Sequence, residues 1–158
     1  MSLLIRKATL AEAGVVHAIM MDAFEQYRRD EPPTSALNET VGSVRMELES
    51  GETAILCFRD GEAVGSVRYL LRDGFYFHRL AVRCTEQGRG AGTAMVRWLE
   101  EEARRTGQEV IWLKVRPSQT RNLEWYRRLG YLRSTESEDL NPNGEMVKTV
   151  RMFRTLSR

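Results

Sequence analysis

Hydrophobic and polar residues alternate with two different periods along the chain, and the period indicates which segments form helices and which form strands. Residues 3–8 predict a short first strand. Thr9 and Glu12 then have the spacing of a capping box, which opens a helix. The apolar residues of this helix recur on one face and are Val15, Val16, Ile19, Met20, Ala23 and Phe24. The start of the chain therefore predicts a strand followed by an amphipathic helix.

A second helix is predicted over residues 35–49. The sequence PPTS precedes it, and prolines end any helix that comes before them. The apolar residues of the second helix recur at helical intervals and are Leu37, Val41, Val44 and Leu48. Gly51 provides a residue at which such a helix can end.

Three strands in succession are predicted in the middle of the chain, over residues 53–58, 62–71 and 75–82. Asp60 and Gly61 separate the first two, and this dipeptide favours a tight hairpin turn between antiparallel strands. The third strand is rich in aromatic and apolar residues. The middle of the chain therefore predicts an antiparallel meander.

The second half of the chain predicts two helices and three strands. The first helix follows a glycine-rich turn and ends at Gly107, with Glu100–Arg104 and Glu101–Arg105 spaced as i, i+4 ion pairs on its outer side. Residues 110–115 are almost all apolar, which is typical of a parallel strand buried on both faces. A short helix stopped by Gly130 follows, and strands near 131–137 and 146–154 close the sheet.

These elements predict an α/β fold in a single domain that spans residues 1–158. The sheet is expected to be mixed, mostly antiparallel and flanked by about four helices. A chain of 158 residues is long enough to bury a core of its own.

Composition excludes several classes of protein. The chain is 42% hydrophobic and 29% charged, which is ordinary for a soluble globular domain. No apolar run approaches the roughly 18 residues that span a bilayer, and the N-terminus lacks a signal-peptide pattern, so we expect a cytoplasmic protein without membrane contact. The net charge of +2 is too small to indicate nucleic acid binding. Cys57, Cys84, His17 and His78 lack metal-site spacing, so we expect neither a metal nor a disulfide.

The stretch EQGRGAGTAMVRWLEEEARR, residues 86–105, places three glycines immediately before a helix. A turn of this kind offers backbone N–H groups, the positive end of a helix dipole and no Cβ atoms that would keep an anion away. A phosphate-binding turn and a plain flexible turn both fit this pattern. The Gly-Lys-Ser/Thr ending of a Walker A loop is absent, and the G-x-G-x-G spacing differs from the G-x-G-x-x-G of dinucleotide-binding folds.

The glycine turn resembles the Q/R-x-x-G-x-G/A signature of the GCN5-related N-acetyltransferase (GNAT) family. The predicted order of helices and strands is also similar to the order in that family over nearly the whole chain. The resemblance implies that the backbone of this segment holds the pyrophosphate of acetyl-CoA. The residues that it implicates are Gln87, Gly88, Arg89, Gly90, Ala91, Gly92 and Thr93.

Two further segments resemble motifs of the same family. Leu80-Ala81-Val82 is similar to the L-x-V sequence that lies beside the pantetheine arm. RNLEWYRRLGY is similar to N-x-x-x-Y-x-x-x-G-F/Y, in which Asn122 would hold the pantetheine and Tyr126 would lie near the coenzyme sulfur. Many family members have an asparagine seven residues before this tyrosine, where this chain has Gln119.

The resemblance implies an acetyl-CoA-dependent N-acetyltransferase in which a primary amine attacks the thioester directly. Such an amine has an unperturbed pKa of about 10.4, so a base must remove a proton before attack. The N–H of Val82 is a candidate donor to the developing oxyanion, and Tyr126 is implied as the acid that protonates the thiolate. His78, on the expected strand face of Leu80 and Val82, is the candidate base.

Other interpretations of these residues stay open at this stage. Tyr27, Asp30 and Glu31 are alternative bases, and His78 can also be satisfied within the sheet. Tyr126 can be a core aromatic and Asn122 a helix cap. Cys84 as a nucleophile has little support, because isolated cysteines are usually inert.

The partners that the sequence implies are a small-molecule amine or a protein amine as acceptor, with a homodimer possible. The acidic residues near the end of the chain are Glu136, Glu138 and Asp139, which form either an attractive surface for a cationic amine or a solvated loop. The alternative function is a non-catalytic acyl-CoA-binding regulatory or sensor module of the same fold. A nucleic-acid-binding domain has little support, because no basic and aromatic surface pattern occurs.

Overall fold

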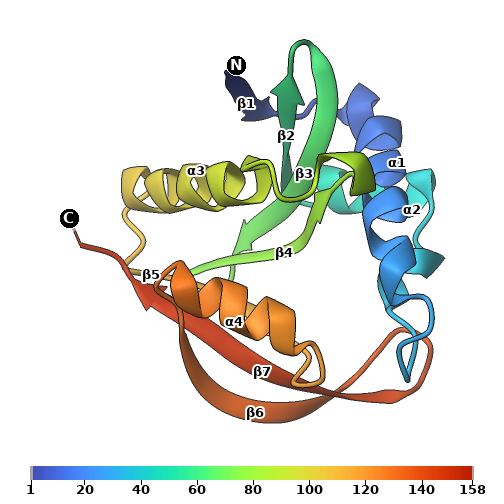
Figure 1. The fold of residues 1–158 in the computed structure, drawn as a ribbon, viewed down its shortest axis with the longest axis vertical. Coiled ribbons are helices and arrows are strands. Elements are labelled where there is room, and N and C mark those ends of the chain that lie inside the picture. Colours follow the sequence, from blue (N-terminus) through green and yellow to red (C-terminus); the bar gives the residue numbers. More distant parts are fainter. Residues whose placement is uncertain (1, 158) are drawn as a thin grey trace. The chain divides into compact units, whose positions relative to one another are not determined.

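A computed structural model of the chain describes residues 2–157, which contain seven strands and four α-helices (Figure 1). The strands are β1 (Leu3–Lys7), β2 (Thr53–Arg59), β3 (Glu62–Leu71), β4 (Phe75–Val82), β5 (Val110–Val115), β6 (Leu132–Leu140) and β7 (Met146–Thr155). The helices are α1 (Ala13–Phe24), α2 (Val41–Glu49), α3 (Ala91–Arg105) and α4 (Thr120–Arg128). Short 3₁₀ turns occur at η1 (Leu10–Glu12), η2 (Glu25–Tyr27), η3 (Ser35–Asn38) and η4 (Cys84–Glu86).

The strands form one sheet in the hydrogen-bonded order β1-β2-β3-β4-β5-β7-β6. β4 and β5 pair in parallel, whereas β1–β2, β2–β3, β5–β7 and β6–β7 pair antiparallel. Asp60 and Gly61 both have positive φ in the β2–β3 hairpin, as an Asp-Gly turn requires. The predicted meander, the parallel step from β4 to β5 and the mixed, mostly antiparallel sheet with about four helices are therefore confirmed.

Contacts between residues divide the chain into two compact units. The first comprises Met1–Leu70 and Phe77–Leu99, and the second comprises Leu71–Tyr76 and Glu100–Arg158. In the first unit, α1 packs against α2. The core of this unit combines apolar residues of both helices with residues of β2 and β4, including Val16, Ile19, Met20, Val44, Leu56 and Ala81.

The capping box forms as expected and opens η1, since Glu12 accepts a hydrogen bond from the backbone N–H of Thr9 at 2.9 Å. A 3₁₀ turn then leads into the helix at Ala13. The expected apolar face is buried at Val16, Ile19 and Met20, whereas Val15 at its margin is exposed. The local sequence pattern thus identifies the capping box before α1 and the buried face of this helix.

The predicted helix over residues 35–49 is wrong over residues 35–40. Residues 35–38 form the separate turn η3, and α2 begins only at Val41. Glu39 between them is extended, with φ −71° and ψ 151°, and Thr40 caps α2 by accepting from the N–H of Ser43. Contacts of Glu39 with distant residues, described below, hold the chain out of a helix at this point.

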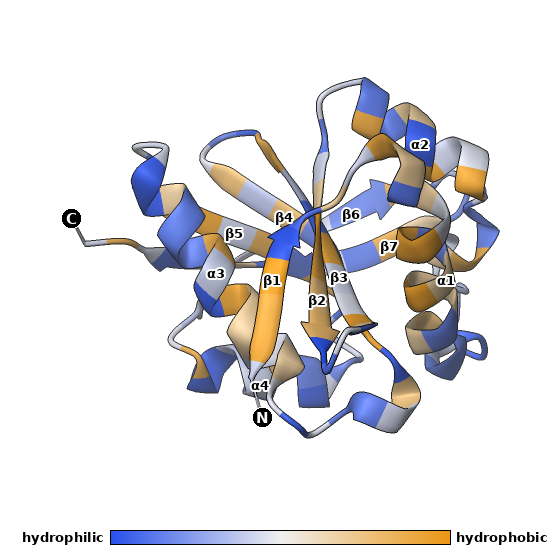
Figure 2. Ribbon diagram, turned by 90° about the horizontal axis from the view of Figure 1, so that it is seen from above, coloured by the Kyte–Doolittle hydropathy of each residue, from blue (hydrophilic) through white to orange (hydrophobic). Residues whose placement is uncertain are grey.

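In the second unit, the apolar residues of β5 and β7 make the core, and β6 forms its outer edge. Ile111, Val150 and Met152 are buried, whereas nearly all of β6 is exposed. The hydropathy colouring shows the contrast between β2, which is mainly hydrophobic, and β6, which is mainly hydrophilic (Figure 2). Asn141 closes the β6–β7 turn by accepting hydrogen bonds from the N–H groups of Asn143 and Glu145.

Candidate active site

The glycine loop, residues 86–92, connects η4 to the N-terminus of α3. Gly88 and Gly90 have φ values of 77° and 92°, a region that residues with side chains rarely adopt, and a Cβ added at either residue would lie within 4 Å of no atom beyond the adjacent residues. Gly92 differs, because it lies inside the first turn of α3. The first helical hydrogen bond runs from Ala94 N–H to Gly90 O, so the preceding N–H groups of this turn have no acceptor within the helix. The loop therefore has the open backbone and the dipole that an anionic group needs.

A buried arginine from β2 supports this loop. Arg59 is 9% exposed and donates from Nε to Glu86 Oε1 and from Nη2 to the carbonyl oxygen of Arg89, both at 2.8 Å. Arg89 Nη1 also donates to Glu86 at 3.0 Å. One planar guanidinium thus joins the two ends of the turn that contains Gly88. The sequence analysis missed Arg59, because nothing local connects a residue at the end of β2 to a loop 27 to 30 residues later.

The last residues of β4 lead directly into the glycine loop. Arg83 N–H donates to Val64 O on β3, and Gln87 Nε2 donates to the carbonyl oxygen of Val82 at 3.3 Å. Leu80 and Val82 are partly exposed, and Ala81 between them is buried. The backbone that the sequence assigned to the pantetheine arm is therefore continuous with the loop assigned to the pyrophosphate.

β4 is irregular at Arg79, which has a φ of 58°. Positive φ is uncommon for a residue with a side chain and interrupts the regular alternation of a strand. The expectation that His78 shares one regular strand face with Leu80 and Val82 therefore does not follow from a period of two. The directions of the His78 and Arg79 side chains follow instead from their contacts with Glu52 and Glu39.

His78 contacts a carboxylate that the sequence analysis did not consider. Its Nε2 lies 2.7 Å from Glu52 Oε2, and Glu52 precedes β2 by one residue. The side chain of Glu52 is only 6% exposed, whereas that of His78 is 27% exposed. The imidazole therefore lies between a buried carboxylate and the protein surface.

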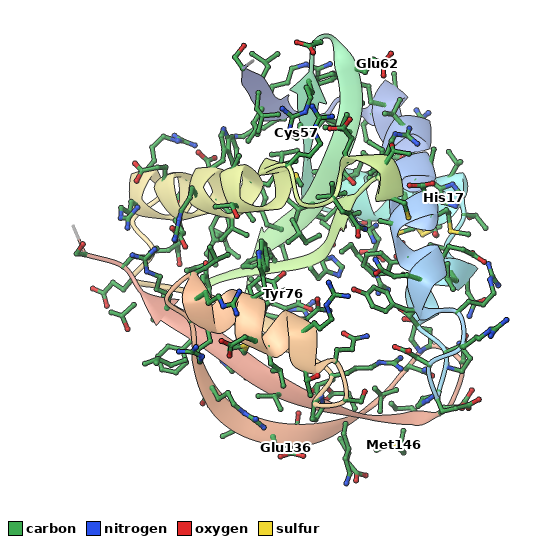
Figure 3. The ribbon with its side chains drawn as sticks, viewed as in Figure 1. His17, Cys57, Glu62, Tyr76, Glu136 and Met146 are labelled. Carbon is green, nitrogen blue, oxygen red and sulfur yellow. The ribbon has the colours of Figure 1, made fainter. Side chains whose placement is uncertain are left out.

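Glu52 belongs to a buried charge network, formed by Glu39, Glu52, Arg68, His78 and Arg79. Arg68 is 1% exposed and donates from Nη1 and Nη2 to the two oxygens of Glu39, at 3.0 and 2.6 Å. Arg79 Nε donates to Glu39 Oε2 at 2.8 Å. The backbone carbonyl of Glu39 also accepts from Nε2 of His17, which Figure 3 labels on α1. These contacts explain why residue 39 interrupts the helix that the local pattern predicts.

The network shifts the pKa values of His78 and Glu39. Burial lowers the pKa of His78 below its ordinary value; the bond and charge of Glu52 oppose this lowering, and the charges of Arg68 and Arg79 add to it. Burial alone would raise the pKa of Glu39, but hydrogen bonds and charge from Arg68 and Arg79 outweigh burial and lower it. The neutral imidazole is the form of histidine that accepts a proton.

The other predicted motif lies in the second unit, on α4. Tyr126 is 7% exposed, and its ring makes edge contacts with Trp125 and Tyr131 at centroid distances of 4.8 and 5.9 Å. Asn122 does not cap α4, because the helix begins at Thr120 and Gln119 is the cap residue. Instead Asn122 Nδ2 donates to Gln119 Oε1 at 3.1 Å.

Tyr131 anchors the end of α4 through a second buried carboxylate. Its hydroxyl donates to Glu100 Oε2 at 2.8 Å, and Arg154 Nη1 donates to Glu100 Oε1 at 2.7 Å. Burial, reinforced by Glu100, raises the pKa of Tyr131. The outer i, i+4 pairs expected on α3 are wrong, since Glu100 is 2% exposed and turned inward. The ion pairs that form are Arg104–Glu101, with an exposed glutamate, and Arg105–Glu102, with a buried one, both at i, i+3.

The alternative candidate residues lie elsewhere in their units. Tyr27 is in η2 with its ring against Phe24, at a centroid distance of 5.6 Å. Cys84 is exposed, with its N–H bonded to Asp22 Oδ2 and its Sγ 3.4 Å from Asp22 O. In the second unit, Glu136 is exposed on β6 (Figure 3), so the acidic residues lie on a strand and not in a loop. Asp139 binds Lys114 at 3.0 Å, which lowers its pKa.

Residues 2–157 contain neither a candidate metal-binding cluster nor a candidate membrane-spanning helix. No group of three or more His, Cys, Asp or Glu side chains is arranged to hold a metal ion in this part of the chain. Among the same residues, no helix combines the length and the apolar character that are needed to cross a membrane.

Sequence comparison identifies the family. The model of the acetyltransferase (GNAT) family matches residues 15–131, a range that includes most of α1 and all of β4, the glycine loop and α4. The match covers well over half of the chain, and the chain therefore belongs to the GNAT acetyltransferase family. No curated protein matches the sequence significantly.

Solved structures have the same fold at low sequence identity. A GCN5-related N-acetyltransferase from Rhodopseudomonas palustris has a TM-score of 0.82 at 20% identity, covering 99% of this chain and 97% of that chain. Ribosomal-protein-alanine N-acetyltransferase from Brucella melitensis has a TM-score of 0.77 at 19% identity, covering 97% and 99%. The protein yncA from Salmonella typhimurium, solved with its cofactor acetyl-CoA, has a TM-score of 0.75 at 16% identity, covering 100% and 96%.

Proposed function

We propose that this protein is an acetyl-CoA-dependent N-acetyltransferase, with residues 1–158 acting as one acetyltransferase domain. The observation that carries the proposal is the open glycine loop at the start of α3, in a chain of the GNAT family. Backbone N–H groups of residues 87–93 would hold the pyrophosphate, and the backbone of residues 80–82 would lie along the pantetheine. The acceptor is a primary amine on a small molecule or on a protein.

His78 is proposed as the base. In its neutral form it accepts a proton from the substrate ammonium, directly or through a water molecule, and the free amine attacks the thioester carbonyl. The N–H of Val82 is proposed to donate to the oxygen that becomes negative as the C–N bond forms. No covalent intermediate on the protein is needed.

Tyr126 is proposed as the acid. Of the two protons that the ammonium loses, one leaves through His78 to solvent. The other reaches the coenzyme sulfur through Tyr126 as the C–S bond breaks. Asn122 is proposed to bind the pantetheine, with Gln119 orienting its amide.

Ligand-induced stabilisation tests the coenzyme part of the proposal. A ligand at a hundred times its dissociation constant adds about 2.7 kcal/mol of stability. The melting temperature should rise with acetyl-CoA and with CoA, but not with ATP. Release of free thiol from acetyl-CoA with a panel of amines then tests transfer. The absence of a shift with millimolar acetyl-CoA would contradict the proposal.

Tyr126→Phe separates an enzyme from a protein that only binds acyl-CoA. Removing the hydroxyl should lower kcat by about a hundredfold or more while the dissociation constant of CoA stays within a factor of about two. An assay of thiol release measures kcat, and calorimetry measures the dissociation constant of CoA. An unchanged kcat would exclude Tyr126 as the acid, and a wild-type protein without turnover on any amine would favour the binding module.

A further inference from the structure

We propose that Glu52 is the positioning residue for the catalytic base: it accepts the Nε2 proton of His78 and so assigns Nδ1 as the atom that receives the proton of the amine. This inference rests on the proposed function and deepens it. It names a carboxylate that lies outside every motif used above and 26 residues from the histidine.

The geometry selects one tautomer of the imidazole. A carboxylate oxygen accepts and does not donate, so the atom that faces Glu52 Oε2 at 2.7 Å must carry the hydrogen. In the neutral ring the other nitrogen, Nδ1, then has the lone pair. A bond of this length to a carboxylate also fixes the plane of the ring.

Glu52 is more buried than His78, as expected if Glu52 positions the histidine and the histidine meets the substrate. Glu52 is 6% exposed at its side chain and cannot meet a substrate in solution, whereas His78 is 27% exposed and can. An ion pair that only stabilises a core does not require one of its two side chains to be exposed to solvent. The arrangement places the fixed charge inside and the titrating group outside.

The two arginines of the network donate hydrogen bonds to Glu39 but not to Glu52, so the negative charge of Glu52 is less fully compensated. Glu39 accepts three directed hydrogen bonds from Arg68 and Arg79. Glu52 Oε1 lies 3.3 Å from Arg68 Nε, but the pair is poorly aligned and neither atom makes a hydrogen bond. Arg68 therefore interacts with Glu52 only through charge attraction, while its two Nη groups donate hydrogen bonds to Glu39.

A proton on His78 would be stabilised by this charge. The charged groups that act on the imidazole are Glu52 before β2, Arg68 on β3 and Arg79 on β4, and only Glu52 favours the imidazolium. Glu52 therefore makes His78 a stronger base than burial and the two arginines would leave it. Its removal should weaken the base without touching the coenzyme loop.

The test compares Glu52→Gln with wild type across pH. The acid limb of kcat/KM reports the base of the free enzyme, and without Glu52 that limb should move to lower pH while kcat on its plateau falls. KM for acetyl-CoA should stay unchanged. The basic limb set by the amine substrate should not move, because that proton belongs to the substrate. His78→Asn should lower kcat by about a hundredfold or more and remove the limb.

Glu49→Gln is the matched control. Glu49 lies three residues earlier, is 54% exposed and pairs with Arg45 at 3.3 Å, so the same substitution removes an outer ion pair. It should leave kcat, KM and both limbs unchanged. An acid limb that stays in place in Glu52→Gln, with wild type active, would overturn the inference and leave the proposed function intact.

A measurement on the wild-type protein covers the case in which Glu52→Gln does not fold. Nitrogen-15 NMR of the neutral imidazoles distinguishes the two tautomers, and His17 provides the second histidine signal as a reference. His78 should carry its hydrogen on Nε2, and an Nδ1–H tautomer would overturn the inference. Absence of turnover on every amine would overturn the proposed function together with the inference.

Discussion

Gly90→Ala perturbs the glycine loop at a residue with positive φ. Gly90 has a φ of 92°, and no protein atom lies within 4 Å of an added Cβ. The substitution therefore costs backbone strain but creates no overlap inside the protein. A Cβ at this place would point into open space, where the proposed function places the pyrophosphate.

The expected magnitudes follow from these two facts. Forcing an L-residue into the left-handed region costs about 1–2 kcal/mol. For a protein of this size, each kcal/mol shifts the melting temperature by about 2–4 °C, so the free protein should melt about 2–8 °C lower. Loss of hydrogen bonds to a charged group costs about 1.5–3 kcal/mol, which is roughly a 10- to 150-fold loss of coenzyme affinity.

Thermal unfolding with and without CoA separates the two effects. At a CoA concentration a hundred times the wild-type dissociation constant, the wild-type protein gains about 2.7 kcal/mol. At that concentration a tenfold to hundredfold weaker variant gains only about 0.4–1.4 kcal/mol.

Gly14→Ala is the control. Gly14 lies in α1 with open space around an added Cβ, so alanine should stabilise the free protein by about 0.5–1 kcal/mol. The gain on adding CoA should equal that of wild type. If Gly90→Ala lowers the melting temperature but binds CoA as tightly as wild type, the glycine is required only for the turn, and the assignment of the loop to pyrophosphate is refuted.

Two further substitutions test the support of the loop and of the β4–β5 pair. Arg59→Lys should weaken CoA binding by about tenfold in calorimetry, because an ammonium cannot reproduce the planar contact with Arg89 O; an unchanged affinity would show that the loop keeps its shape without it. Gly74→Ala should cost about 1–3 kcal/mol in urea unfolding, since φ is 111° and the new Cβ would lie 2.8 Å from Val110 O. Gly144→Ala also has positive φ, at 83°, but open space, so it should cost less; equal costs would mean that the overlap at residue 74 is relieved.

Local patterns predicted most of the fold. The bounds of β3, β4 and β5 agree with the prediction, because alternation, apolar runs and turn residues act over neighbouring positions. The capping box at Thr9 and the Asp60–Gly61 hairpin are signals of the same kind. The helix α3 was also expected, but it begins at Ala91, before the last glycine of the expected turn. The glycine loop was found because positive φ at residues 88 and 90 requires glycine, which is visible in any sequence.

Long-range contacts explain where the prediction was wrong. The helix expected from residue 35 breaks at Glu39, whose carboxylate binds Arg68 and Arg79. Glu100 fits an exposed i, i+4 pair by spacing, but binds Tyr131 and Arg154 instead. One signal was available and not used, namely a charged residue at position 68 within an otherwise apolar stretch of strand.

The sequence by itself determined the order of helices and strands and the glycine loop, since each depends on residues close together in the chain. Tyr126 became a candidate through its resemblance to a family motif, and His78 through a strand face that Arg79 interrupts. Only the tertiary structure decided that Arg59 supports the loop and that Glu52 faces His78. These pairs are separated by 26 to 30 residues and meet because β2, β3 and β4 are neighbours in one sheet. The carboxylate beside His78 depends on a side-chain contact between residues 26 positions apart, and no pattern among neighbouring residues encodes such a contact.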